Sequence, residues 1–218
     1  MNQLTKAYKF FTKKEKDLIL KKYIDDGFCV FSFEGIETYK HKISGKETKS
    51  PKGLPKGWIN IDPNNHLKYI NTKSHKGFGF IAGDKSNVTV IDIDNMEVYY
   101  QMLKKYPKLK NYRTIVTNKG VHLYCKYDKD IITYTNALKS YDKVDIRNDD
   151  AITFCPPTQY KLLDGSIATY VDIGGEILPF PKFIKKDLKQ YSKSKNIIHN
   201  EQNIMFFDDS EKKITYSF

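Results

Sequence analysis

The stretch NVTVIDIDN, residues 87–95, constrains the fold more than any other part of this chain. The run from Val88 to Ile93 is rich in β-branched residues, which favour a packed strand. Asp92 and Asp94 interrupt it two residues apart, so their side chains point to the same face of that strand. Two carboxylates this close raise each other's pKa unless a cation lies between them. The stretch therefore predicts a buried strand that presents a pair of acids to a cation.

The remaining pattern predicts short strands and a few helices. A Thr-x-x-Glu capping box followed by an apolar stripe indicates a helix over residues 12–24, and a second helix is expected over 96–106. Residues 34–63 are rich in Gly, Lys, Thr and Pro, which indicates loops. Strands are expected over 28–33, 78–82, 88–93, 114–117, 122–127, 144–147 and 152–155.

Turn residues separate the last six strands into three successive pairs, which we expect to form hairpins. Short strands with turn signals, and helices at intervals, indicate an α+β fold with largely antiparallel pairing. The segment PKFIKKDLKQYSKSK, residues 181–195, holds six lysines and one acid and predicts a basic helix that leads into a linker. We expect an N-terminal helical segment over 1–27, one folded domain over 28–190, and a linker or tail over 191–218.

The charge balance is basic, with 37 Lys and Arg against 26 Asp and Glu, a net charge of +11. Such a surplus favours nucleic acid or nucleotide partners, although the Lys-rich composition of an A+T-rich genome explains it equally well. No apolar run approaches the roughly 20 residues that span a bilayer, and no secretory signal is evident. We expect a cytoplasmic protein without a membrane partner.

Further side chains that can bind ligands or take part in catalysis follow the acid pair. In VDIR, Asp145 and Arg147 share one strand face, and in TNKGVHLY, His122 follows Gly120 by two residues. Lys119 and Gly120 lie in a turn where backbone N–H groups and an ammonium can approach a phosphate. Each feature alone is common in structural positions. Together they match the needs of two-metal phosphoryl transfer.

The ordered set VIDID, NKGVH, VDIR and AITFCPPT resembles the primase–polymerase branch of the archaeo-eukaryotic primase superfamily. Asp92 and Asp94 match its Asp-x-Asp motif, Gly120 and His122 its small-x-His motif, and Asp145 its third, acidic motif. The likeness covers about residues 28–185, includes KGLPKGW upstream, and is greatest to the N-terminal domains of primase–helicases from large DNA viruses, mobile elements and phages. One departure is NKGVH in place of the frequent Ser-Gly-Gly-x-His.

The resemblance implies a DNA primase/polymerase that makes primers from nucleoside triphosphates on a single-stranded DNA template with Mg²⁺ or Mn²⁺. Asp92, Asp94 and Asp145 would hold the metals. The implied catalytic half is an RRM-like antiparallel sheet with flanking helices, joined to a smaller N-terminal α/β module. A helicase partner, fused or separate, is implied as well, in a host cytoplasm or a viral replication compartment.

The resemblance also assigns the nucleotide site. His122 would contact the triphosphate of the incoming NTP or dNTP, with Lys119 and Gly120 beside it, and Arg147 would contact a triphosphate or template phosphate. Candidate contacts with nucleic acid are Lys56, Trp58 and Thr158.

Two other functions fit the same residues. A two-metal nuclease would use the same acids on water. A non-catalytic replication-initiation module would bind DNA through its basic surface and use the acids only structurally. Because His122 and Lys119 suit a triphosphate, they favour the polymerase.

Overall fold

The computed structural model of the chain describes residues 6–189 apart from residues 8 and 44. The expected linker and tail over 191–218 lies outside the described residues. The chain combines helices with antiparallel sheets, so the α+β prediction is confirmed, while the RRM-like character of the sheet stays an expectation. Within the described part, no helix combines the length and the apolar character needed to cross a bilayer.

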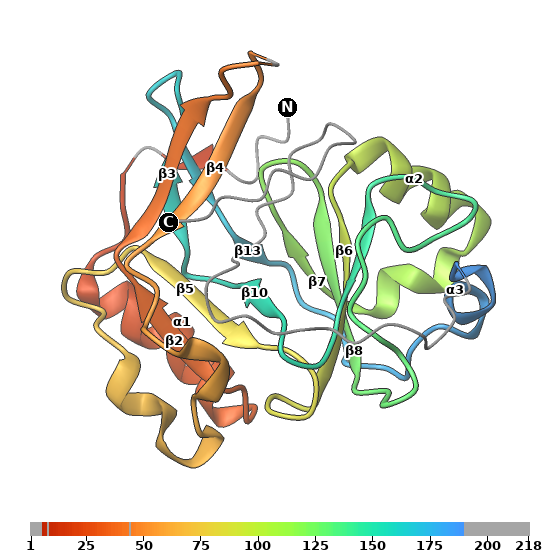
Figure 1. Cartoon of the computed structure of the whole chain (residues 1–218), viewed down its shortest axis with the longest axis horizontal. Helices are drawn as coiled ribbons and strands as arrows, with labels where there is room; N and C mark the ends of the chain where they lie inside the picture. The colour runs from red at the N-terminus through yellow and green to blue at the C-terminus, as the bar shows by residue number, and fades with distance from the viewer. Residues whose placement is uncertain (1–5, 8, 44, 190–218) are drawn as a thin grey trace.

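One half of the molecule is built on a five-stranded antiparallel sheet, on the right in Figure 1. Its order is β13 (Val171–Asp172), β7 (Arg113–Val116), β8 (Val121–Lys126), β6 (Val88–Ile93) and β9 (Val144–Arg147). Every residue of β6 is buried, as its β-branched run predicts. The core under this sheet is completed by α2 (Met96–Lys105), the 3₁₀ helix η4 (Pro107–Asn111) and α3 (Lys182–Asp187).

The other half has two three-stranded sheets and a hairpin around a second core. The sheets are β10 (Ile152–Phe154), β5 (Gly77–Ile81) and β2 (Val30–Phe33), and β1 (Lys6–Ala7), β12 (Ile167–Thr169) and β11 (Gln159–Lys161). The hairpin is β3 (Gly35–Lys40) with β4 (Glu47–Lys52), and two 3₁₀ helices follow it, η2 (Trp58–Asn60) and η3 (Pro63–Tyr69).

Helix α1 (Lys13–Asp25) covers this second core and begins where the sequence predicts. The Glu15 backbone N–H donates to the Thr12 hydroxyl at 3.3 Å, and the Thr12 backbone N–H donates to the Glu15 carboxylate at 2.6 Å. This reciprocal pair satisfies two of the N–H groups that a helix start leaves without partners. The sequence predicts an apolar stripe of Leu18, Ile19 and Tyr23. Tyr23 is buried together with Leu20, but Leu18 is 74% exposed, so the buried face of the helix differs from the predicted one.

The prediction of loops over 34–63 is wrong for most of its first half. The hairpin ladder there runs from the pair Gly35–Lys52 to the pair Lys40–Glu47. Within the two strands Ile36 alone is buried, and their sequences lack the apolar alternation that marks a half-buried strand. Contact with β11 supports the hairpin, and the Thr38 hydroxyl donates to the Lys161 carbonyl at 2.8 Å.

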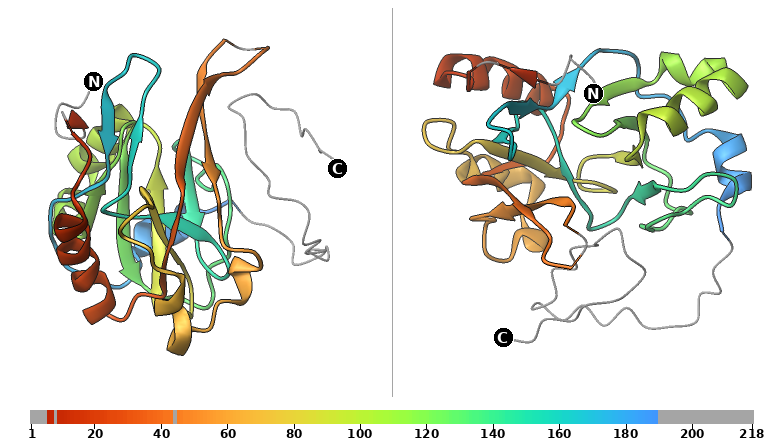
Figure 2. Two further views of the ribbon diagram at one scale, coloured as in Figure 1. Left: turned by 90° about the vertical axis from the view of Figure 1, so that its left-hand side faces the viewer. Right: turned by 90° about the horizontal axis from the view of Figure 1, so that it is seen from above.

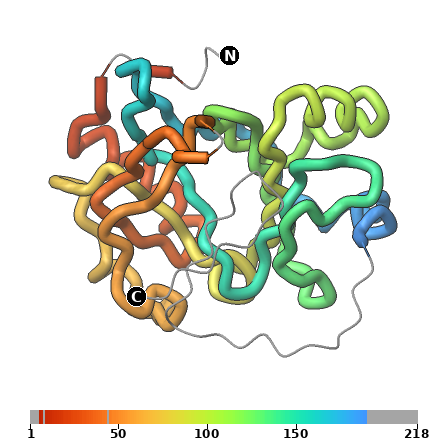
Figure 3. Tube along the Cα trace, turned by 45° about the horizontal axis from the view of Figure 1, so that its top comes forward, coloured from red at the N-terminus to blue at the C-terminus, as the bar shows by residue number. Residues whose placement is uncertain are grey.

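Two of the three expected hairpins are also wrong. β7 pairs with β8 as predicted, but β5 and β6 belong to different sheets, and so do β9 and β10. A single bridge between Gly83 and Val88 is what remains of the first hairpin. β6 pairs instead with β8 on one edge and with β9 on the other. The two connections therefore cross side by side between the halves (Figure 3), where the Asp84 N–H donates to Asp149 at 3.1 Å.

A buried arginine ties α1 to the five-stranded sheet. The Arg113 side chain on β7 is 5% exposed, and its guanidinium lies 2.6 Å from the Asp26 carboxylate and 3.0 Å from that of Asp172. Its carbon Cζ lies 4.7 Å from the ring centre of Tyr23, within cation–π range. Because the group is almost fully desolvated, these partners replace its water.

Replacing Arg113 by Met should lower the free energy of unfolding by about 3–5 kcal/mol, since Asp172 would be left nearly buried with only the exposed Lys22 ammonium and the Gly174 N–H as partners. Urea unfolding measures this change. The control is Lys21→Met, which removes an exposed ion pair with Asp25 on α1 and should cost about 0.3–0.5 kcal/mol. Equal costs for the two variants would contradict this role of Arg113.

Candidate active site

The register of β6 with its two neighbours brings three side chains of the site together. On β6, Asp92 lies directly opposite His122 of β8 and directly opposite Asp145 of β9. Directly opposed residues of antiparallel strands point to the same face. Asp94 follows two residues after Asp92, just past the end of β6. The acids that the sequence singles out thus meet on one face, at one edge of the sheet.

The three carboxylates fit a divalent cation. Asp92, Asp94 and Asp145 each offer an oxygen, and these oxygens lie within 4.8 Å of one another. Carboxylate oxygens are hard ligands of the type that Mg²⁺ and Mn²⁺ prefer. The donor set therefore suits the metals that the sequence led us to expect.

Arg147 bridges two of these acids. Its Nη2 lies 3.3 Å from the Asp92 carboxylate and 2.9 Å from the Asp145 carboxylate. The shared face of Asp145 and Arg147 was expected from their spacing, and Asp92 joins them because β9 pairs with β6. The guanidinium thus fixes the orientation of two candidate ligands and offsets part of their charge.

The pKa values show how crowded the acids are. Burial raises the pKa of Asp145 to about 6, with Asp92 and Asp94 adding to the rise and Arg147 opposing it. The charge of Asp92, and then burial, raises the pKa of Asp94. Burial alone would raise the pKa of Asp92 as well, but His122, Arg147 and Lys49 lower it below its usual value. Asp94 and Asp145 are therefore harder to ionise than a free aspartate, and a further cation beside them would lower their pKa values.

Lys49 on β4 is a residue of this site that sequence reasoning missed. Its Nζ lies 3.1 Å from the Tyr170 hydroxyl, and its charge lowers the pKa of both Asp92 and Asp94. Burial lowers the pKa of the Lys49 ammonium, but its neighbours, Tyr170 first, raise it above the usual value. It was missed because it lies in the segment expected to be loop, and no local pattern places β4 beside the acids.

His122 is held against the first acid. Its Nε2 lies 3.3 Å from the Asp92 carboxylate, and its ring meets that of Tyr170 edge-on, with centroids 5.7 Å apart. Its Nδ1 is buried and has no hydrogen-bond partner among the described residues. The imidazole is therefore oriented by contacts within the site, and its expected contact with a triphosphate stays a prediction.

Gly120 permits a close approach of backbones beside Asp94. A Cβ at this position would collide with the carbonyl oxygen of Ile93, and it would lie 2.8 Å from the backbone nitrogen of Asn95. The turn packs against the end of β6 through the Met96 N–H, which donates to the Lys119 carbonyl at 3.2 Å. The glycine thus places the turn, and with it the exposed Lys119, next to Asp94.

A basic cavity adjoins the acids. Lys46, Lys119 and Lys143 line it together with Asp94, and its volume is about 280 Å³. These lysines come from the hairpin, from the turn before β8 and from the residue before β9. The Asp94 N–H donates to the Lys143 carbonyl at 2.9 Å, so the wall of the cavity is continuous with the acid cluster. Three ammonium groups at this place suit an anion such as a polyphosphate.

The three expected nucleic-acid contacts lie apart from this cluster. Lys56 is exposed, and Trp58 is half-buried against the core of its own half. Thr158 is fully buried, where its hydroxyl donates to the Phe78 carbonyl at 2.7 Å and accepts from the Phe78 N–H at 2.9 Å. The described contacts of Thr158 are thus structural.

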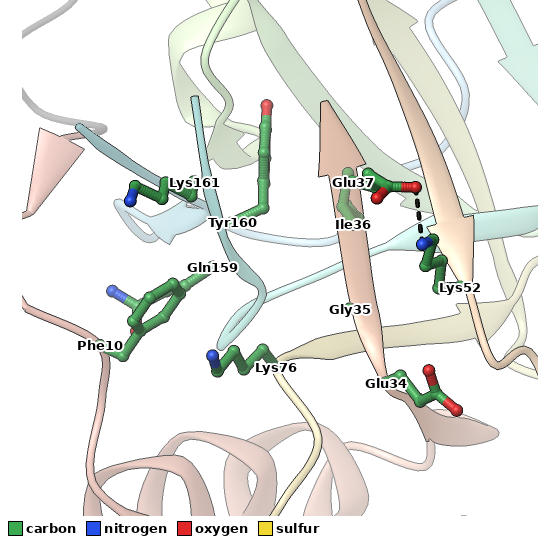
Figure 4. A pocket seen from close by; sticks show the side chains of 10 residues that line it. All are labelled: Phe10, Glu34, Gly35, Ile36, Glu37, Lys52, Lys76, Gln159, Tyr160 and Lys161. Carbon is green, nitrogen blue, oxygen red and sulfur yellow. Dashed lines mark ion pairs between the residues drawn. The ribbon is translucent and has the colours of Figure 1, made fainter. Parts of the chain in front are cut away.

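A second hollow, of about 230 Å³, lies between β3, β11 and the N-terminal segment (Figure 4). On one side of it the Lys76 ammonium lies 4.3 Å from the ring centre of Phe10, and Glu37 pairs with Lys52 at 2.7 Å on the other. None of the clustered acids lines it. It is therefore separate from the site described above.

The chain matches a known protein family along most of its length. The family model described as "Bifunctional DNA primase/polymerase, N-terminal" matches residues 21–181. This is well over half of the chain, so the chain belongs to that family. No curated protein matches it. Membership confirms the resemblance inferred from the motifs and implies nucleotidyl transfer of the primase/polymerase type in DNA replication, with DNA and nucleotides as substrates.

The raised pKa of Asp145 predicts that its charge destabilises the metal-free protein. For an acid with a raised pKa, stability present below the unfolded pKa, near 4, is lost as the pH rises through about 6. At pH 7.5 without divalent cations, Asp145→Asn should therefore raise the Tm by on the order of 5 °C. At pH 4 the two proteins should melt together.

Calorimetry at the two pH values measures this difference. The control is Asp142→Asn, because Asp142 is exposed on the loop before β9. An Asp145→Asn variant that melts below the wild type at pH 7.5 would contradict the electrostatic description of the cluster.

Proposed function

We propose that this chain makes primers on a single-stranded DNA template by metal-assisted nucleotidyl transfer. In that reaction a terminal hydroxyl oxygen bonds to the α-phosphorus of a nucleoside triphosphate, and pyrophosphate leaves. One observation carries the proposal: three carboxylates converge beside a cavity lined by three lysines. Oxygen ligands for metals and ammonium groups for phosphates are the two needs of this chemistry.

Asp92, Asp94 and Asp145 would hold Mg²⁺ or Mn²⁺. Divalent cations at such a site supply charge neutralisation for the reacting phosphate and activate the attacking oxygen. The protein's own part is to keep the carboxylates in place: β6 is buried on both faces, and Arg147 holds Asp92 and Asp145 together. Ligands fixed in this way lose little freedom when the substrate binds.

The basic groups would receive the triphosphate. Lys119 and Lys143 flank Asp94 in the cavity, so phosphates bound there would lie next to the acids. His122 and Lys49 approach from the side of Tyr170. We propose His122 as a triphosphate contact and as the group that orients Asp92, and Gly120 as the residue that keeps the turn close. Arg147 lies between Asp92 and Asp145. Its charge would therefore act on the phosphates from the far side of these two metal ligands.

The wider setting follows from the resemblance. We propose either NTPs or dNTPs as substrates and a helicase, fused or separate, as the partner that exposes the template. A viral or mobile-element replication system, in a host cytoplasm or a viral replication compartment, fits the motifs that the chain shares with primase–helicases. Lys56 and Trp58 stay candidate DNA contacts, and buried Thr158 would support the fold through its bonds to Phe78.

Asp92→Asn should abolish primer synthesis, with a loss of more than about 100-fold, because the central ligand would lose its charge. The measurement is a template-directed assay with labelled triphosphates in Mg²⁺ and in Mn²⁺, with circular dichroism to verify the fold. Asp142→Asn, an exposed carboxylate outside the cluster, is the control and should keep full activity. Primer synthesis by Asp92→Asn at the wild-type rate would contradict the proposal.

The same assay separates the two rivals. A nuclease would shorten labelled DNA in the presence of metal and would not extend it. A DNA-binding initiation module would do neither, and its DNA affinity would be the same in Asp92→Asn and the wild type, with or without metal. The lysine-lined cavity beside Asp94 supports the polymerase over both, since water and single-stranded DNA alone need no triphosphate site.

A further inference from the structure

The β3–β4 hairpin projects from the fold beside the acid site. It forms a separate two-stranded sheet, and its tip extends in the same direction as the end of β6 that carries the acids (Figure 1, and Figure 2, left). One flank of the hairpin packs on β11 through Thr38. Beyond Lys40 and before Glu47 the ladder ends, and the described tip residues belong to no sheet.

The tip is strongly basic. Between residues 40 and 46 the sequence holds Lys40, His41, Lys42 and Lys46 and no acid. Lys40 and Lys42 are exposed. Cations gathered on a projecting β-ribbon attract a polyanion rather than a protein surface of mixed charge.

An isoleucine stands among these cations. Ile43 is 84% exposed, more than any other large hydrophobic side chain in the described part of the chain. It contributes to neither core. Proteins that bind the minor groove of duplex DNA insert apolar side chains such as isoleucine between base steps and unstack them, and an exposed isoleucine among cations could do the same to a single strand.

The end of β4 nearest the tip reaches the acid site. Lys46, at the end of the tip, lines the cavity beside Asp94, and Lys49, three residues further, contacts Tyr170 next to His122. A strand held at the tip would therefore lie close to the candidate metal ligands. The hairpin thus connects a basic, exposed tip with the candidate active site.

We infer that this tip binds single-stranded template DNA: Lys40 and Lys42 contact its phosphates, and Ile43 inserts between two of its bases. The inference rests on the proposed function for its choice of nucleic acid. The tip holds the template while the acid site acts on the nucleotide. This binding is independent of base sequence, because its contacts are with phosphates and base faces.

The phosphate contacts are tested by the salt dependence of binding. Fluorescence anisotropy with a labelled single-stranded oligonucleotide, without nucleotides or divalent cations, gives the slope of log K against log[salt]. Losing two phosphate contacts lowers the slope by about 1.4 for single strands, so Lys40→Gln/Lys42→Gln should show this change. The matched control is Lys108→Gln/Lys110→Gln, two exposed lysines at the same spacing on η4, which should leave the slope unchanged.

Ile43 is tested by base stacking. A template that carries 2-aminopurine should brighten when wild-type protein binds, because unstacked 2-aminopurine is more fluorescent. Ile43→Ser should bind with the same salt slope and lose the increase. Leu18→Ser, which changes an exposed apolar residue on α1, should keep it.

The outcomes distinguish this inference from the proposed function. Equal salt slopes for the hairpin and η4 variants overturn the phosphate contacts. A fluorescence increase that Ile43→Ser retains overturns the insertion between bases. If either occurs while the wild type still makes primers, the inference alone fails. A wild-type protein that binds no single-stranded DNA overturns both.

Discussion

The crowding of three carboxylates on one sheet face is the constraint to which the rest of the structure responds. The ladder register brings Asp145 opposite Asp92, and the spacing of two residues places Asp94 beside them. Such a cluster is unfavourable without cations. The protein places basic groups beside the cluster, among them Arg147 and Lys49, yet the pKa values of Asp94 and Asp145 stay raised. That remaining imbalance is what a divalent cation would remove.

The fold makes this unfavourable arrangement rigid. Two features meet at the end of β6: its burial between β8 and β9, and a turn that approaches closely because position 120 is glycine. The two crossing connections and buried Arg113 fasten the other half of the molecule to this sheet. That half in turn contributes the hairpin, which brings Lys46 and Lys49 to the acids. The site is therefore assembled from both halves.

Local features of this structure could be predicted from the sequence, and features that depend on long-range pairing could not. The capping box at Thr12 and the shared face of Asp92 and Asp94 each lie within a few residues, where helical and strand periodicity decide the geometry. The position of Lys49 depends on a polar hairpin supported by β11. The sequence of this hairpin has no apolar alternation from which its strands could be predicted. The separation of β5 from β6 depends likewise on β8 and β9, which follow later in the chain.

Binding of Mn²⁺, followed by electron paramagnetic resonance of the free ion, tests the central claim most directly. The wild type should remove free Mn²⁺ from solution, and Asp94→Asn should weaken this binding by at least about tenfold, because one ligand of the cluster is lost. Asp142→Asn should bind as the wild type does. If Asp94→Asn and the wild type bind Mn²⁺ equally, the three carboxylates are not a metal site, and the account given for the charge cluster is contradicted.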